Sequence, residues 1–176
     1  TSTARATIGS HLRDADGVVA PGALATLVDA TGGGLAAGAA HPDWIATADL
    51  TLHLVGPVHA TTVVAHGRVI RRGRTTIVLG VDLTDERDGT LGTATMSFAV
   101  LPRRDGNPVV EAPTEPVRFA FAPVDDVPYP RFDEAIGITL DGSDAVAPMT
   151  PFVVNTLGAM QGGAVATLSL IHISEP

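Results

Sequence analysis

The chain contains no cysteine and no lysine, and its 176 residues carry a formal net charge of −8 at pH 7. Without cysteine there is no disulfide, no thiolate nucleophile and no cysteine-ligated metal site. An acidic chain also lacks the basic surface with which proteins bind the phosphates of nucleic acids. We therefore expect no nucleic-acid partner, although Arg71, Arg72 and Arg74 form a local basic cluster.

Long apolar runs and nucleotide-binding motifs are missing as well. No stretch approaches the ~20 apolar residues that span a bilayer, so no membrane partner is expected. The histidines show no metal-ligand spacing, and the sequence has no G-x-S-x-G motif, P-loop or dinucleotide fingerprint. We expect no metal. The hydrophobic share of 45% is ordinary for a globular protein, so a sizeable core is expected.

One long amphipathic helix is predicted near the start of the chain, from about Ala23 to about Ala39. Its apolar residues recur at steps of three and four, which places them on one helix face: Leu24, Leu27, Val28, Thr31 and Leu35. Gly32, Gly33 and Gly34 weaken this helix by roughly 1 kcal/mol each relative to Ala. A helix that keeps three glycines is expected to have a close packing neighbour.

The period then changes to two, which indicates β-strands with one covered face. In residues 47–54, for example, Ala48, Leu50, Leu52 and Leu54 alternate with polar residues. Alternation or β-rich composition predicts strands over 3–9, 47–54, 59–73, 76–84 and 93–100. The order of one strand, one helix and four strands favours an α+β fold in which an antiparallel sheet wraps one central helix, because this buries both apolar faces.

Two segments far apart in the chain repeat the same phrase. Residues 16–27 read DGVVAPGALATL, and residues 157–168 read LGAMQGGAVATL. Their offset is constant at 141 residues, the separation of Gly17 and Gly158. This offset is too long for a solenoid, whose repeats span ~20–50 residues. It predicts an internal duplication.

A proline-rich stretch separates the two copies. Residues 102–130 hold seven prolines, which remove backbone donors and fix the backbone. The predicted organisation is therefore one complete unit over 1–101, a linker or draped segment over 102–131, and the start of a second unit over 132–168.

The glycine-rich loop of the second copy resembles a known family. NTLGAMQGG at 155–163 is similar to the N-x-x-G-x-x-H-G-G signature of hotdog acyl-CoA thioesterases of the phenylacetate-degradation type. ALATLVDATGG at 23–33 is similar to the helix of that family. The resemblance implies a tandem double-hotdog protein, truncated in its second repeat. It also implies a cytoplasmic homo-oligomer that hydrolyses acyl-CoA thioesters, with coenzyme A as part of the substrate and no separate cofactor.

The resemblance further implies a site shared by the two units. In the family, an acidic residue lies nine positions after the motif His, and this corresponds to Asp29 because Ala20 stands at the His position of the first unit. Carried over by position, the second unit contributes Asn155, Gln161, Gly162 and Gly163. Asp29 would act as general base or nucleophile, the glycine amides would hold the oxyanion, and Asn155 would orient the water or the carbonyl.

The reciprocal site departs from the family motif and is expected to be inactive. Its loop has Asp14, Ala20 and Pro21 where the motif has Asn, His and Gly, and Pro21 has no N–H to donate. Its acid position falls on Leu170. The last eight residues, SLIHISEP at 169–176, resemble translated sequencing-adapter sequence and are expected to be non-native.

Other interpretations of these residues stay open. Asp29 is alternatively a solvated helix carboxylate, although it falls on a helix face of small residues where a close surface would desolvate it and raise its pKa. The QGG segment is alternatively a tight turn, and Asn155 a loop hydrogen-bonding residue. The three clustered arginines would bind the phosphates of coenzyme A or form an exposed hairpin tip. For the whole protein, the alternatives are a non-catalytic acyl-CoA-binding or assembly module, and a hydratase on the same fold, for which no Asp–His pair is found.

Overall fold

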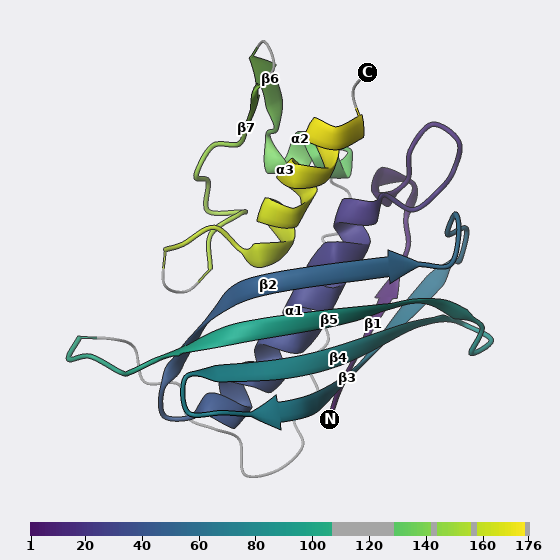
Figure 1. Ribbon diagram of the computed structural model, residues 1–176. Helices are drawn as coiled ribbons and strands as arrows, with labels where there is room; N and C mark the ends of the chain where they lie inside the picture. The colour runs from purple at the N-terminus through teal and green to yellow at the C-terminus, as the bar shows by residue number, and fades with distance from the viewer. Residues whose placement is uncertain (107–128, 142–143, 156–157, 175–176) are drawn as a thin grey trace.

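The computed structural model describes residues 1–106, 129–141, 144–155 and 158–174, and its main feature is an antiparallel sheet around one long helix (Figure 1). The helix is α1 (Pro21–Ala40), preceded by a short 3-10 turn at Ser10–Leu12. The five strands are β1 (Ser2–Thr7), β2 (Trp44–Leu54), β3 (Thr62–Arg72), β4 (Thr76–Asp85) and β5 (Thr90–Leu101). They lie in the order β1-β3-β4-β5-β2. The predicted order of strand, helix and four strands is confirmed.

The core lies between α1 and the concave face of the sheet. Leu24 and Val28 of α1 are fully buried, and they belong to the same apolar cluster as Leu79, Met96 and Phe98 of the sheet. By length and composition α1 is the one described helix that is apolar enough to cross a membrane, which the sequence reading did not predict. Half of this apolar stretch is buried inside the protein, as in the core helix of a folded domain.

The alternation predicted for β2 is correct in its second half and wrong at Ala48. Leu50 and Leu52 pack against the core, but Ala48 is exposed. The register of β2 with β5 shifts between Thr47 and Asp49, so Ala48 is the extra residue of a β-bulge. Because a bulge inserts one residue, both Thr47 and Leu50 face α1.

The chain after the sheet forms a smaller group of elements beside the first half of α1 (Figure 1). These elements are α2 (Phe132–Ile136), β6 (Thr139–Asp141), β7 (Asp144–Val146) and α3 (Gly162–Ser174). Most of the predicted linker, residues 107–128, lies outside the described residues. α3 packs directly on α1, and its residue Ala164 forms a small apolar cluster with Ile136 of α2 and with Val153.

The two copies of the repeated phrase have the same backbone hydrogen bonds at positions 141 residues apart. Asp14 N–H donates to Val18 at 2.9 Å, and Asn155 N–H donates to Ala159 at 2.8 Å. The residue before each helix also donates its backbone N–H to a carbonyl oxygen that precedes the loop. Ala20 donates to Leu12 at 2.9 Å, and Gln161 donates to Val153 at 2.8 Å. The turn glycines, Gly17 and Gly158, have φ of +76° and +74°. The two loops therefore have the same backbone geometry, and the duplication itself stays a prediction.

Adjacent glycines of α1 have opposite packing requirements, which gives a test of the fold. A Cβ on Gly32 would lie 2.7 Å from the sulfur of buried Met96, whereas a Cβ on Gly33 would meet no atom within 4 Å. We expect Gly32→Ala to destabilise the protein by about 1–3 kcal/mol through overpacking. Gly33→Ala should stabilise it by up to about 1 kcal/mol through helix propensity. Urea unfolding of both variants checks this, and equal effects would contradict the described packing.

Candidate functional site

The site is built on a close crossing of α1 and α3. A Cβ on Gly163 of α3 would lie 2.5 Å from Cα of Thr26 on α1. A Cβ on Gly22 of α1 would likewise lie 2.5 Å from Oγ1 of Thr167 on α3. The two contacts are reciprocal, since Gly22 and Thr26 correspond to Gly163 and Thr167 in the repeated phrase. Only glycine lets the helices approach this closely, and the crossing brings the start of α3 against the middle of α1.

Asp29 lies at this crossing and is buried, with 5% of its surface exposed. Its Oδ1 accepts a hydrogen bond of 2.9 Å from the hydroxyl of Thr47 on β2. The backbone amides of Gly162 and Gly163, at the first turn of α3, also donate to this carboxylate. The alternative of a solvated helix carboxylate is therefore wrong. A Cβ on Gly162 would lie 2.7 Å from Oδ1 of Asp29, so a side chain at this position would displace the carboxylate.

Burial raises the pKa of the Asp29 carboxyl above its ordinary value of 3.8. The loss of water around the charge is the largest cause, because it favours the neutral form. The Thr47 hydroxyl and the amides of Gly163 and Gly162 act in the opposite direction, because they donate to the ionised form. The expected rise in the pKa is thus confirmed.

Thr47 is the site residue that the sequence reading missed. It lies directly before the bulge of β2 and opposite Phe98 of β5 in the strand register. A regular strand cannot place both Thr47 and Leu50 on the helix side, because their separation of three residues puts them on opposite faces. The sequence holds no signal for it, because residues 47–54 alternate without a break and only the register shift in the structure turns Thr47 toward α1.

The predicted loop residues have mainly backbone roles in the described structure. Oδ1 of Asn155 accepts the amide of Ala159 at 3.1 Å, which closes the loop. The carbonyl of Gln161 accepts the amides of Ala164 and Val165 at 3.0 and 3.1 Å, so Gln161 is the residue from which α3 starts. Both Asn155 and Gln161 line the same cavity as Asp29. The structure therefore brings together all five residues predicted to do the chemistry.

An open cavity of about 1400 Å³ runs along the whole of α1 and contains this group. One wall is β2, with Phe98 of β5 behind it, and the other is Asn155 together with residues of the 159–170 segment. The lining is mostly apolar, with Asp29 and Thr47 near its middle. This arrangement of a buried acid, a hydroxyl and two helix-start amides can activate a nucleophile and stabilise a developing anion.

The remaining predicted residues lie apart from this group. Arg71, Arg72 and Arg74 are exposed at the end of β3 and the following turn, and none of them lines the cavity. Their contact with phosphates of coenzyme A stays a prediction. Pro21 and Leu170, from the reciprocal site, line the cavity but offer no polar side chain.

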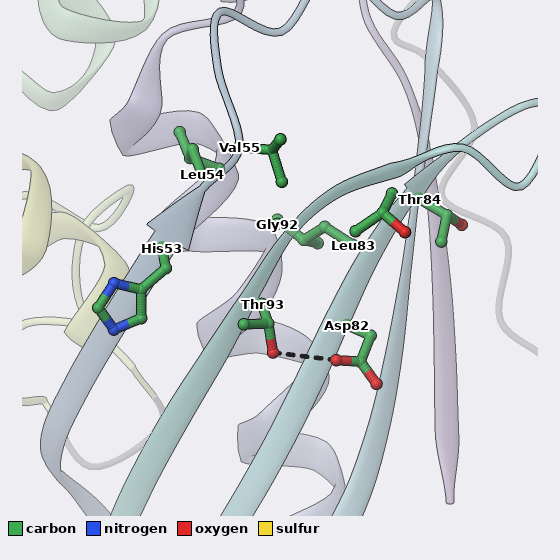
Figure 2. A pocket seen from close by; sticks show the side chains of 9 residues that line it. His53, Leu54, Val55, Asp82, Leu83, Thr84, Gly92 and Thr93 are labelled. Atoms are coloured by element: carbon green, nitrogen blue, oxygen red, sulfur yellow. Dashed lines mark hydrogen bonds between the residues drawn. The ribbon is translucent and has the colours of Figure 1, made fainter.

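A smaller hollow of about 410 Å³ lies where β2 and β4 end and β5 begins (Figure 2). Thr93 donates to Asp82 across it at 2.9 Å, while the imidazole of His53 points away from this pair. Both residues of this pair are exposed to solvent, so neither is desolvated as Asp29 is. The larger cavity is therefore the candidate site.

Comparisons with known proteins agree with this architecture. The Thioesterase superfamily domain matches residues 16–91, which include α1, β2, β3 and β4. No protein of curated function matches the sequence.

Solved structures share the fold, which is the hotdog fold predicted from the sequence. BH2602 from Bacillus halodurans, solved with CoA, is 26% identical, with a TM-score of 0.54 over 58% of this chain and 68% of that chain. The smu.793 protein from Streptococcus mutans, bound to acetyl CoA, is 20% identical, with a TM-score of 0.52 over 58% and 82%. The PaaI protein of the E. coli phenylacetic acid degradation operon is 16% identical, with a TM-score of 0.52 over 56% and 71%.

The helix crossing predicts a specific rescue. Gly22→Ala should destabilise the protein by about 1–3 kcal/mol, because the new methyl group meets the side chain of Thr167. Thr167→Ala removes the two nearest atoms, so the double variant should be more stable than Gly22→Ala alone. Gly163→Ala should not be rescued by Thr26→Ala, because its nearest contact is the Cα of Thr26. Free energies of unfolding for the two cycles test this, and equal rescue in both would contradict the crossing.

The raised pKa of Asp29 predicts how stability depends on pH. The folded protein holds the Asp29 proton more tightly than the unfolded chain does, so the contribution of Asp29 to stability is most favourable below the ordinary pKa of 3.8 and falls as pH rises to the folded pKa. Asp29→Asn removes this loss. We expect the stability of the variant relative to the natural chain to increase with pH across that window and then level off. Urea unfolding from pH 3 to pH 8 measures it, and a difference that is constant with pH would argue against the burial described.

Proposed function

We propose that this protein hydrolyses acyl-CoA thioesters at the crossing of α1 and α3. The observation that carries the proposal is the Asp29 carboxylate, which is buried in a large apolar cavity against the first amides of α3. A thioester needs a nucleophile or base near its carbonyl carbon and donors for the oxyanion that forms. The Thioesterase superfamily match and the CoA-bound relative BH2602 support the substrate class.

Asp29 is proposed to act on the thioester carbonyl, and Thr47 is proposed to position the Asp29 carboxylate. In the general-base route, Asp29 takes a proton from water as the water oxygen attacks the carbonyl carbon. The carbon–sulfur bond then breaks, the thiolate of coenzyme A takes up the proton, and a carboxylic acid and free coenzyme A leave. In the nucleophilic route, an oxygen of Asp29 attacks the carbonyl carbon, the carbon–sulfur bond breaks, and coenzyme A leaves as its thiolate. Water then cleaves the mixed anhydride to the carboxylic acid and the free Asp29 carboxylate. The raised pKa suits the first route, because a base works best when its pKa lies nearer the working pH.

The amides of Gly162 and Gly163 are proposed to hold the oxyanion. They belong to the first turn of α3, where backbone N–H groups have no partner within the helix and lie at the positive end of its dipole. Donors of this kind contribute roughly 3–4 kcal/mol to lowering the barrier. Since these amides face the Asp29 carboxylate in the described structure, a bound carbonyl oxygen has to share them or displace the carboxylate.

The tandem organisation belongs to the same proposal. One repeat supplies the acid and the other supplies the amides, so the two copies form a single site. The matched hydrogen bonds of the two loops support the duplication. The missing N–H of Pro21 supports a single active site, because the position equivalent to Gly162 cannot donate.

The test is thioester cleavage by Asp29→Asn. We expect kcat for acyl-CoA hydrolysis, measured as release of free thiol, to fall by at least about 10²-fold, while binding of a non-hydrolysable S-alkyl-CoA persists. Asp82→Asn, on the far side of the sheet, is the matched control and should cleave at the natural rate. Cleavage by neither the natural chain nor the control, with S-alkyl-CoA binding retained, would instead identify an acyl-CoA-binding module.

A further inference from the structure

We infer that the end of the β3–β4 hairpin binds anionic lipid surfaces, with its arginines on the lipid phosphates and its aliphatic side chains at the edge of the hydrocarbon. The residues concerned, which we call the hairpin tip, are Arg68, Val69, Ile70, Arg71, Arg72 and Arg74 (Figure 1 shows the hairpin). None of them lines the described cavity around Asp29, so this inference is independent of the proposed hydrolysis.

Positive charge is concentrated at the hairpin tip of an otherwise acidic chain. Four of the eleven arginines lie within residues 68–74, although the formal net charge is −8. Residues 67–81, which include the end of β3, the turn and the first part of β4, contain no Asp or Glu. In the described part of the chain none of these four arginines forms a salt bridge. Their charges are therefore available to an anionic partner.

The fold holds cationic and aliphatic side chains together at the hairpin tip. The register of β3 with β4 shifts between Val69 and Arg71, so Ile70 is the extra residue of a β-bulge. A Cβ on Gly80 would lie 3.3 Å from both Cζ of Arg68 and Cδ1 of Ile70. These two side chains therefore lie over Gly80 on the same face of β4, in the space that the missing side chain leaves.

The aliphatic side chains of the hairpin tip face solvent. Val69 is 39% exposed and Ile70 is 52% exposed, and the arginines on either side of them are exposed as well. Aliphatic residues among cations suit the boundary of a membrane, where anionic phosphates lie above hydrocarbon. Guanidinium groups bind phosphates through paired N–H donors, while aliphatic side chains gain free energy on leaving water.

The hairpin tip does not lie on the side of the sheet that the second copy borders. α3 packs against α1 and contacts β2, which is the edge strand on that side. β5 lies between β2 and β4, and β3 lies one strand farther away. The exposure of the hairpin tip therefore does not arise from the border with the second copy.

The residues around the hairpin tip favour a lipid surface over a nucleic acid. Proteins hold single-stranded nucleic acids by stacking the bases on aromatic side chains. Residues 55–97 contain no Phe, Tyr or Trp, and the hairpin tip presents aliphatic side chains instead. The expectation of no membrane partner followed from the absence of a spanning run, which contact with a membrane surface does not need.

The test is flotation of the full chain with vesicles of phosphatidylcholine alone and of phosphatidylcholine mixed with phosphatidylglycerol. We expect binding to the anionic vesicles only, lost as salt rises from about 0.05 M to about 0.5 M. Arg71→Gln combined with Arg72→Gln should weaken binding on the order of 25-fold, because each arginine at an anionic surface contributes about fivefold. Arg5→Gln combined with Arg87→Gln changes the net charge equally at two other exposed positions, and this control should bind as the natural chain does.

Ile70→Ser tests the aliphatic part of the contact. It should weaken binding to anionic vesicles about tenfold, because less apolar surface leaves water, and it should leave the salt dependence unchanged. Unaltered affinity of this variant would overturn the inference, as would equal losses in the two arginine pairs or no binding of the natural chain to anionic vesicles.

Two competitors separate lipid from other anions. Coenzyme A that displaces the protein from anionic vesicles at constant ionic strength would overturn the inference, since it would assign the arginines to nucleotide phosphates. Single-stranded DNA bound with the same dependence on Arg71 and Arg72 would overturn it too, in favour of a nucleic-acid surface. No displacement by either competitor supports the lipid contact. None of these outcomes involves thioester cleavage, so the proposed hydrolysis is tested separately.

Discussion

The close approach of α1 and α3 is the constraint on which the rest of the site depends. Two glycines, Gly22 and Gly163, each face a threonine of the other helix, and any side chain on Gly163 would meet the backbone of α1. A wider crossing would leave the first amides of α3 out of reach of Asp29. The same carboxylate would then face water, with an ordinary pKa and no helix start beside it. Helix packing at this one point therefore decides whether the carboxylate of Asp29 is buried beside the start of α3 or faces water.

Burying Asp29 costs stability, and the structure offsets only part of this cost. Thr47 and the two glycine amides donate to the carboxylate, yet the pKa remains raised, so desolvation outweighs the three donors. A carboxylate in this condition is a better base than a solvated one, because its proton affinity is higher. The free energy lost to burial and the reactivity of the group have the same physical origin. Active sites commonly hold such perturbed groups for this reason.

The duplicated loops show that backbone geometry and chemistry are set by different residues. Asp14 and Asn155 close their loops with the same bonds, and the turn glycines have the same left-handed conformation. Among the positions that differ between the copies, the one that bears on the proposed chemistry is the first residue of the helix, where Pro21 starts α1 and Gly162 starts α3. Proline is well suited to the first turn of a helix, so α1 forms normally. It has no N–H, however, and its ring occupies the space that glycine leaves open for a second group.

The sequence by itself determined the strands, the helix, their order and the loop that repeats after 141 residues, because periodicity and turn residues are local properties of the chain. It also predicted Asp29, Asn155, Gln161, Gly162 and Gly163 as site residues, through the family resemblance rather than through periodicity. Only the tertiary structure decided that Asp29 is buried, that Thr47 donates to it, and that Gly33 borders open space while Gly32 packs on Met96. These properties depend on which surfaces meet, and the contacts that settle them join residues far apart in the chain. The bulge at Ala48 is the clearest case, since one inserted residue turns Thr47 toward α1 and no local pattern shows what it will meet there.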